Sequence, residues 1–220
     1  MPAIFITGTD TGVGKTFVAT HLIRALRNRG LDCAGIKPFC CGERTDAERL
    51  AAAADHCEPL DTVNPVWFRA PLAPWAASMV EQRQVDLDLA KETIQTVCAR
   101  RDWVVVEGAG GWLVPVTEHW TLADLVVDWG LPVLVVAADR LGVLNHTLLT
   151  VESIVRHQAP LVGTVLNRLT AEESDASRAT NSVVLEMAQS PRLLGVVEPD
   201  EEALASSIVD SILETPERTA

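Results

Sequence analysis

The chain has 220 residues, of which 48% are hydrophobic and 22% charged. This composition supplies enough apolar material for a folded core and excludes wholesale disorder. Its 18 basic and 30 acidic residues give a formal net charge of −12, so the surface would repel phosphate backbones and anionic lipids. We therefore expect a single domain over residues 1–220, with no nucleic-acid partner and no membrane partner.

The start of the chain and its cysteines bear on its location. The N-terminus runs from Met1 into a glycine-rich turn without a basic n-region, which is not typical of a signal peptide. The longest apolar runs fall well short of the roughly 20 residues that a membrane span needs. The cysteines number five and lack metal-ligand spacing, which favours reduced thiols. We expect a cytoplasmic protein.

Near-continuous apolar runs alternate with helical patterns along the chain. The expected strands are Ala3–Thr7, Cys33–Lys37, Trp103–Glu107, Pro132–Ala137, Leu161–Leu166 and Leu193–Val197. The expected helices are Thr16–Arg29, Asp88–Arg101, Thr121–Trp129, Leu144–His157 and Glu201–Leu213. Two further helical segments are expected after sequences with capping-box spacing, Thr45–Glu48 and Thr170–Glu173. The alternation predicts an α/β fold with a doubly wound, mainly parallel sheet and helices on both faces.

Residues Gly8 to Thr16 form a glycine-rich turn between the first expected strand and the first expected helix. That order surrounds one point with backbone N–H groups and the positive end of a helix, as in the phosphate-binding loop (P-loop) of NTPases. Lys15 would reach the β- and γ-phosphates of a nucleotide, and Thr16 would ligate Mg²⁺. The spacing departs by one residue from the strict GxxxxGK[ST] pattern, because Gly8 precedes Gly14 by six positions.

Two other charged residues stand at the carboxyl ends of expected strands. Lys37 follows four largely apolar residues, and Glu107 follows three valines and precedes a glycine-rich turn. Since the carboxyl ends of parallel strands meet at one edge, both side chains are expected to face the phosphate loop. Glu107 would then hold Mg²⁺. The alternatives are a surface lysine that extends into solvent and a carboxylate that caps a neighbouring helix.

The segment Asp61–Pro74 breaks the alternation. It is rich in proline and contains Trp67 and Phe68. We expect an ordered loop across the edge or mouth of the sheet. Long loops of this kind are often functional, and a plain surface excursion is the alternative.

Together these blocks resemble the dethiobiotin synthetase family. The resemblance covers most of the chain and rests on the order and spacing of six segments, Gly8–Thr16, Ala34–Pro38, Val63–Pro65, Val106–Pro115, Leu141–Asn145 and Leu166–Asn167. It implies a homodimeric ligase that uses Mg²⁺ and ATP to convert 7,8-diaminopelargonic acid and CO₂ into dethiobiotin, ADP and phosphate. In this family an amine takes up CO₂ as a carbamate, the carbamate attacks the γ-phosphate, and the neighbouring amine closes the ring.

The resemblance also implies roles for individual residues. The carbamate and the transferred phosphoryl group would be bound by Thr11, Lys15 and Lys37, and Mg²⁺ by Thr16, Asp46 and Glu107. ATP would be bound by Gly12, Val13, Gly14, Lys15, Thr16, Phe17, Asp46, Glu107, Gly108, Ala109, Gly110 and Asn167. Substrate would be bound by Thr11, Lys37 and Cys41, and its tail carboxylate by Leu141, Gly142, Val143 and Asn145 of the partner subunit. Asp46 and Asn145 have simple alternatives, since each also suits the start of a helix.

The sequence departs from the family pattern at three places. Cys41 stands where the family often has serine, and a thiol is the weaker hydrogen-bond partner. Arg168 follows Asn167 where an acidic residue is common, and Gly195–Pro199 shifts the proline of the family's base-binding loop by one position. Nucleotide selectivity is therefore expected to be relaxed. A ParA/MinD-like ATPase switch is one alternative, but Asp10 occupies the position of that group's additional loop lysine. A P-loop small-molecule kinase is the other alternative. Such a kinase usually has an arginine-rich lid around the transferred phosphoryl group, and this sequence shows no such cluster of arginines.

Overall fold

The computed structural model describes residues 3–169, 177–188, 192–200 and 204–214. The expected capping sequence Thr170–Glu173 and the first residues of the expected helix Glu201–Leu213 therefore lie outside the described residues. The other expected elements can be compared with the structure.

Six parallel strands form the central sheet. They are β1 (Ala3–Gly8), β2 (Cys33–Ile36), β5 (Trp103–Glu107), β6 (Val133–Ala138), β7 (Leu161–Asn167) and β8 (Leu193–Val197). Their order is β2-β5-β1-β6-β7-β8, and every neighbouring pair is parallel. All six predicted strands are confirmed to within one residue at each end. Because β1 lies inside the sheet with β5 and β6 beside it, the carboxyl ends of these three strands meet at one edge.

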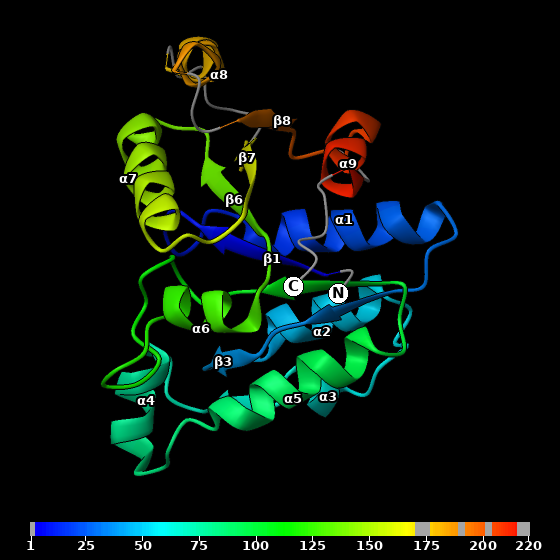
Figure 1. Ribbon diagram of the computed structural model, residues 1–220, viewed down its shortest axis with the longest axis vertical. Helices are drawn as coiled ribbons and strands as arrows, with labels where there is room; N and C mark the ends of the chain where they lie inside the picture. Colours follow the sequence, from blue (N-terminus) through cyan, green and yellow to red (C-terminus); the bar gives the residue numbers. More distant parts are fainter. Residues whose placement is uncertain (1–2, 170–176, 189–191, 201–203, 215–220) are drawn as a thin grey trace.

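Helices cover both faces of the sheet, as predicted (Figure 1). They are α1 (Lys15–Asn28), α2 (Thr45–Ala53), α3 (Leu60–Val63), α4 (Pro74–Glu81), α5 (Leu87–Cys98), α6 (Leu122–Trp129), α7 (Val143–Arg156), α8 (Arg178–Met187) and α9 (Ser206–Leu213). In β1, Ile4 and Ile6 pack in a core with residues of α1, α2 and α9, whereas Phe5 packs in a second core with α5, α6 and α7. This alternation within a fully buried strand explains its continuous apolar run.

The prediction of a loop over Asp61–Pro74 is wrong in part. The segment contains most of α3 and a short strand, β4 (Val66–Phe68), which pairs in parallel with β3 (Phe39–Cys41). Three-residue strands are too short to show a pattern in the sequence. Pro65 directly precedes β4, and Pro74 opens α4, where no backbone donor is needed.

The capping box predicted at Thr45 is also wrong. Arg44 occupies the N-cap of α2, and the Thr45 hydroxyl donates to Glu43 at 3.4 Å. By contrast, Thr121 and Asp124 form a complete capping box at the start of α6. Asp46 stands in the first turn of α2, as expected, and its carboxylate accepts a hydrogen bond from Lys37.

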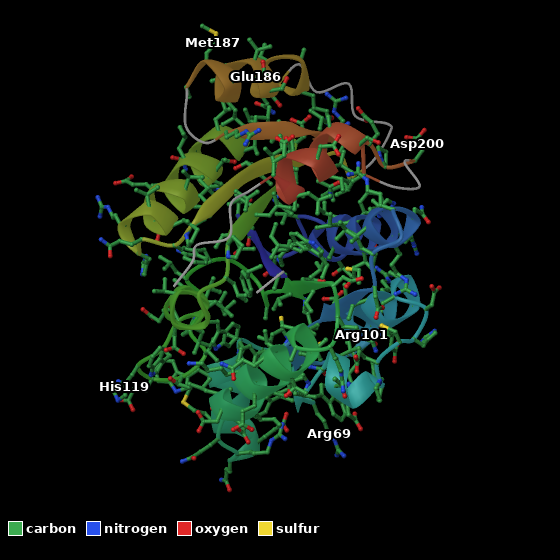
Figure 2. The ribbon with its side chains drawn as sticks, turned by 45° about the vertical axis from the view of Figure 1, so that its right-hand side comes forward. Arg69, Arg101, His119, Glu186, Met187 and Asp200 are labelled. Atoms are coloured by element: carbon green, nitrogen blue, oxygen red, sulfur yellow. The ribbon has the colours of Figure 1, made fainter. Side chains whose placement is uncertain are left out.

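A buried carboxylate ties α5 to the segment between α2 and α3. Glu58 is 4% exposed and accepts hydrogen bonds from Arg100 and Arg101. Arg101 also donates to Asp32 at 2.9 Å, and it lies beside the helices drawn in cyan in Figure 2. These contacts fix the end of the sheet that lies away from the phosphate loop.

We expect Glu58→Gln to lower the free energy of unfolding by about 2 kcal/mol, because two arginines lose their charged acceptor. Urea denaturation followed by circular dichroism measures this change. Glu92→Gln on the exposed side of α5 is the matched control. Equal stability of the two variants would show that the cluster does not stabilise the fold.

Candidate functional site

The turn between β1 and α1 has the geometry of a phosphate-binding loop. Gly14 is the N-cap of α1 and has φ +88°, a conformation that favours glycine. A Cβ at this position would lie 1.9 Å from the side-chain nitrogen of Asn167, so a larger residue would also displace that amide. The Asn167 amide donates to the carbonyl of Val13 at 2.9 Å and joins the loop to the end of β7.

Lys15 is buried inside this loop. It is 6% exposed, and its Nζ donates to the carbonyl of Asp10 at 3.0 Å. Burial, with the nearby charge of Lys37, lowers the pKa of Lys15 to about 8. An anion beside Nζ would favour the charged form, so the loop is suited to a phosphate group.

Lys37 connects two carboxylates beside the loop. Its Nζ lies 2.6 Å from Oε1 of Glu107 and 2.9 Å from Oδ2 of Asp46. The Thr16 hydroxyl donates to the same Oε1 of Glu107 at 2.8 Å. Four residues from α1, α2 and the ends of β2 and β5 therefore meet at one point. The predicted clustering of Thr16, Lys37, Asp46 and Glu107 agrees with this geometry.

Lys37 and Asp46 hold each other in the charged form. Burial by itself would lower the pKa of Lys37, but Glu107 and Asp46 outweigh burial and raise that pKa above its usual value. Burial also opposes ionisation of Asp46, yet Lys37 lowers the pKa of this carboxyl. A charged Lys37 paired with an ionised Asp46 is thus the stable state.

The oxygen atoms of this cluster suit a magnesium ion. Oε2 of Glu107 is buried and has no hydrogen-bond partner among the described residues. Carboxylate and hydroxyl oxygens are the ligand types that Mg²⁺ prefers. The described residues contain no group of three or more His, Cys, Asp or Glu that could hold a metal ion. Further ligands would therefore come from phosphate oxygens and water, as is usual for magnesium–nucleotide sites.

A cavity of about 380 Å³ opens beside this cluster. The predicted site residues in its wall are Thr11, Lys37, Cys41, Asp46, Ala109 and Gly110. Sequence reasoning missed the other wall residues, which are Phe39, Cys40, Glu43, Pro71, Leu72, Ala73, Pro74 and Val114. Pro71–Pro74 belong to the irregular segment Asp61–Pro74, and Val114 belongs to the segment Val106–Pro115, but neither segment had been assigned to this cavity.

Four predicted substrate residues do not line this cavity. They stand at the start of α7, where Gly142 is the N-cap with φ +95° and Asn145 is exposed. Leu141 is 83% exposed, whereas Val143 is buried in a small core with Leu166 and Leu185. Their assignment to a site in a partner subunit stays a prediction.

The strand–loop–helix unit, its buried lysine and the carboxylate at the end of the adjacent strand define a P-loop nucleotide-binding protein. Solved structures support this fold class. A ParA-family ATPase from Chlorobium tepidum TLS aligns with 99% of this chain and 93% of its own, with TM-score 0.55 and 13% identity. The cell-division ATPase MinD of Pyrococcus furiosus aligns with 99% and 90%, with TM-score 0.59 and 17% identity. At such identities the likeness shows the fold alone.

Sequence relatives narrow the class further. A family model described as an AAA domain matches residues 2–206. The chain is 52% identical over 186 residues to the ATP-dependent dethiobiotin synthetase BioD of Anaeromyxobacter dehalogenans strain 2CP-C, covering 83% of each protein. It is 37% identical over 193 residues to the BioD of Akkermansia muciniphila, covering 88% of this chain and 91% of that protein. The chain therefore belongs to the ATP-dependent dethiobiotin synthetase family, a family of ligases.

Family membership confirms the predicted resemblance, the P-loop fold and the ligase class. None of the described helices is long and apolar enough to cross a membrane.

Proposed function

We propose that this chain carboxylates 7,8-diaminopelargonic acid with CO₂ and closes the ring to give dethiobiotin, with conversion of ATP to ADP and phosphate. The observation that carries this proposal is the convergence of Lys15, Lys37 and two carboxylates at a cavity of about 380 Å³ next to the phosphate loop. A small organic substrate in that cavity would lie beside the terminal phosphate of a nucleotide.

The chemistry brings two anions together. A carbamate oxygen attacks the γ-phosphorus, ADP leaves, and the product is a carbamic–phosphoric anhydride. The second amine then attacks the carbonyl carbon and expels phosphate. Lys15, Lys37 and the Thr11 side chain are proposed to bind the carbamate and the transferred phosphoryl group, because fixed positive charge offsets the repulsion. Holding the two reactants in line lowers the entropic part of the barrier.

The nucleotide is proposed to bind along the loop. Backbone groups of Gly12–Phe17 and Glu107–Gly110 would surround the triphosphate, and Thr16, Asp46 and Glu107 would hold Mg²⁺. The metal ion would neutralise phosphate charge during transfer. Asn167 would bind adenine. Its Nδ2 donates to Val13, while its Oδ1 is buried without a partner in the described part of the chain and could accept from an exocyclic amine.

The substrate tail is proposed to reach a second subunit. Leu141–Asn145 opens α7, and backbone N–H groups at a helix N-terminus favour a carboxylate. The proposal includes a homodimer in which this segment completes the site of its partner. It also places the protein in the cytoplasm.

Omission of each co-substrate tests the proposed function. Phosphate release from Mg·ATP should require both diaminopelargonic acid and bicarbonate, and mass spectrometry should detect dethiobiotin only in the complete mixture. Release that ignores both compounds would instead favour an ATPase switch. A stable phosphorylated product without free phosphate would favour a kinase.

Cys41→Ser is expected to keep kcat/KM for diaminopelargonic acid within about threefold of the wild type. Burial, with the nearby Glu81 carboxylate, raises the pKa of Cys41 to about 11, so the side chain is a neutral thiol that a hydroxyl can replace. Steady-state kinetics measure the effect, and Cys98→Ser, at the end of α5 away from the cavity, is the control. Loss of all activity in Cys41→Ser alone would reveal a role that requires sulfur.

A further inference from the structure

Glu43 stands on the wall of the cavity at a rigidly held turn. The preceding residue, Gly42, has φ +88° and its Cβ position lies 3.0 Å from Pro71, so a larger residue would be strained there. The Gly42 N–H donates to the carbonyl of Phe68 at 2.9 Å, and its carbonyl accepts from the Trp67 indole at 2.7 Å. These contacts attach the turn to β4 on both sides. The backbone from which Glu43 reaches the cavity is therefore fixed.

The Glu43 carboxylate has no cationic partner among the described residues, in contrast to the two other carboxylates of the site. Asp46 and Glu107 both bind Lys37. The adjacent Arg44 does not neutralise Glu43, because its guanidinium donates to Asp61, to Asn64 and to the Leu60 carbonyl. Among the side chains that the structure describes, only the Thr45 hydroxyl donates to Glu43, to Oε2 at 3.4 Å. The cavity wall thus carries a cationic group at Lys37 and, on the exposed residue Glu43, a carboxylate that no described cation neutralises.

This charge arrangement matches a vicinal diamine, if the proposed function is correct. One amine must become an anionic carbamate next to the lysines. The other amine enters the site largely as an ammonium group, whose binding in a cavity requires an acceptor or a negative charge. We propose that Glu43 binds the ammonium of the amine that is not carboxylated first and is a specificity-determining residue for the diamine. The inference rests on the proposed function and adds to it the recognition of the second amine.

Glu43→Gln tests this role because it removes the charge and preserves the size. The KM for diaminopelargonic acid should rise about tenfold, while the KM for ATP should stay within about twofold. The increase should shrink as pH rises and the amine loses its proton, an effect that a purely structural role would not produce. Glu48→Gln is the matched control, since Glu48 is an exposed carboxylate on α2 outside the cavity wall.

The outcomes separate the inference from the proposed function. A wild-type enzyme that forms no dethiobiotin would defeat the proposed function itself. A wild-type enzyme that forms dethiobiotin, with Glu43→Gln kinetically equal to Glu48→Gln, would overturn only the role of Glu43. Equal increases in both KM values, or an increase independent of pH, would also overturn it. The predicted result is a pH-dependent increase confined to the diamine.

Discussion

Replacement of Lys37 by alanine is expected to lower kcat about 1000-fold, because the transition state loses a fixed positive charge in a buried site. The side chain is 4% exposed and binds both Glu107 and Asp46, so it is already oriented before substrate arrives. Single-turnover formation of dethiobiotin at saturating ATP measures the chemical step directly. Lys91→Ala, which removes an exposed ion pair with Asp128, is the matched control.

The alanine variant also leaves two carboxylates near each other without their shared cation. Lys37→Gln retains a hydrogen-bond donor and provides a second test if the first variant is unstable. Thermal unfolding and ATP binding should show that the variant is folded and can take up nucleotide. A folded, ATP-binding variant with kcat near that of the wild type would remove Lys37 from the proposed mechanism.

Lys15→Ala is expected to abolish phosphate release rather than only weaken ATP binding, with kcat falling at least about 1000-fold. Lys15 is the buried cation of the phosphate loop, and its Nζ is held by the Asp10 carbonyl at 3.0 Å. A charge at this point acts on the phosphoryl group during transfer, so saturating ATP should not restore activity. Phosphate release at increasing ATP concentration measures this. Full recovery at high ATP would show that Lys15 serves binding alone.

The sequence predicted the sheet well because its strands are buried on both faces. Such strands appear as continuous apolar runs, and the glycine-rich turn after β1 identifies the edge at which the carboxyl ends meet. Lys37 and Glu107 could be assigned to that edge because each ends a strand. The 2.6 Å distance between them depends on the pairing of β2 with β5, and the 2.8 Å distance from Glu107 to Thr16 depends on the position of α1. Both required the structure.

The wall of the cavity could not be predicted in the same way. β3 and β4 have three residues each, and their parallel pairing joins segments whose proximity no local pattern encodes. The position of Glu43 depends on Gly42, which contacts both Phe68 and Trp67 of β4. Pairing of this kind is a tertiary property. The resemblance to a family assigned Cys41 to the substrate site by its position in the sequence. Glu43 could be assigned to the cavity only from the structure.

The central claim is that a carbamate oxygen attacks the γ-phosphate. Bicarbonate labelled with ¹⁸O tests this most directly, because the bridging oxygen of the anhydride comes from CO₂ and leaves with phosphate when the ring closes. In short incubations that limit exchange with water, mass spectrometry should find one ¹⁸O in the released phosphate for each dethiobiotin formed. Unlabelled phosphate accompanying labelled dethiobiotin would show that phosphate does not take its oxygen from the carbamate, and would contradict the account.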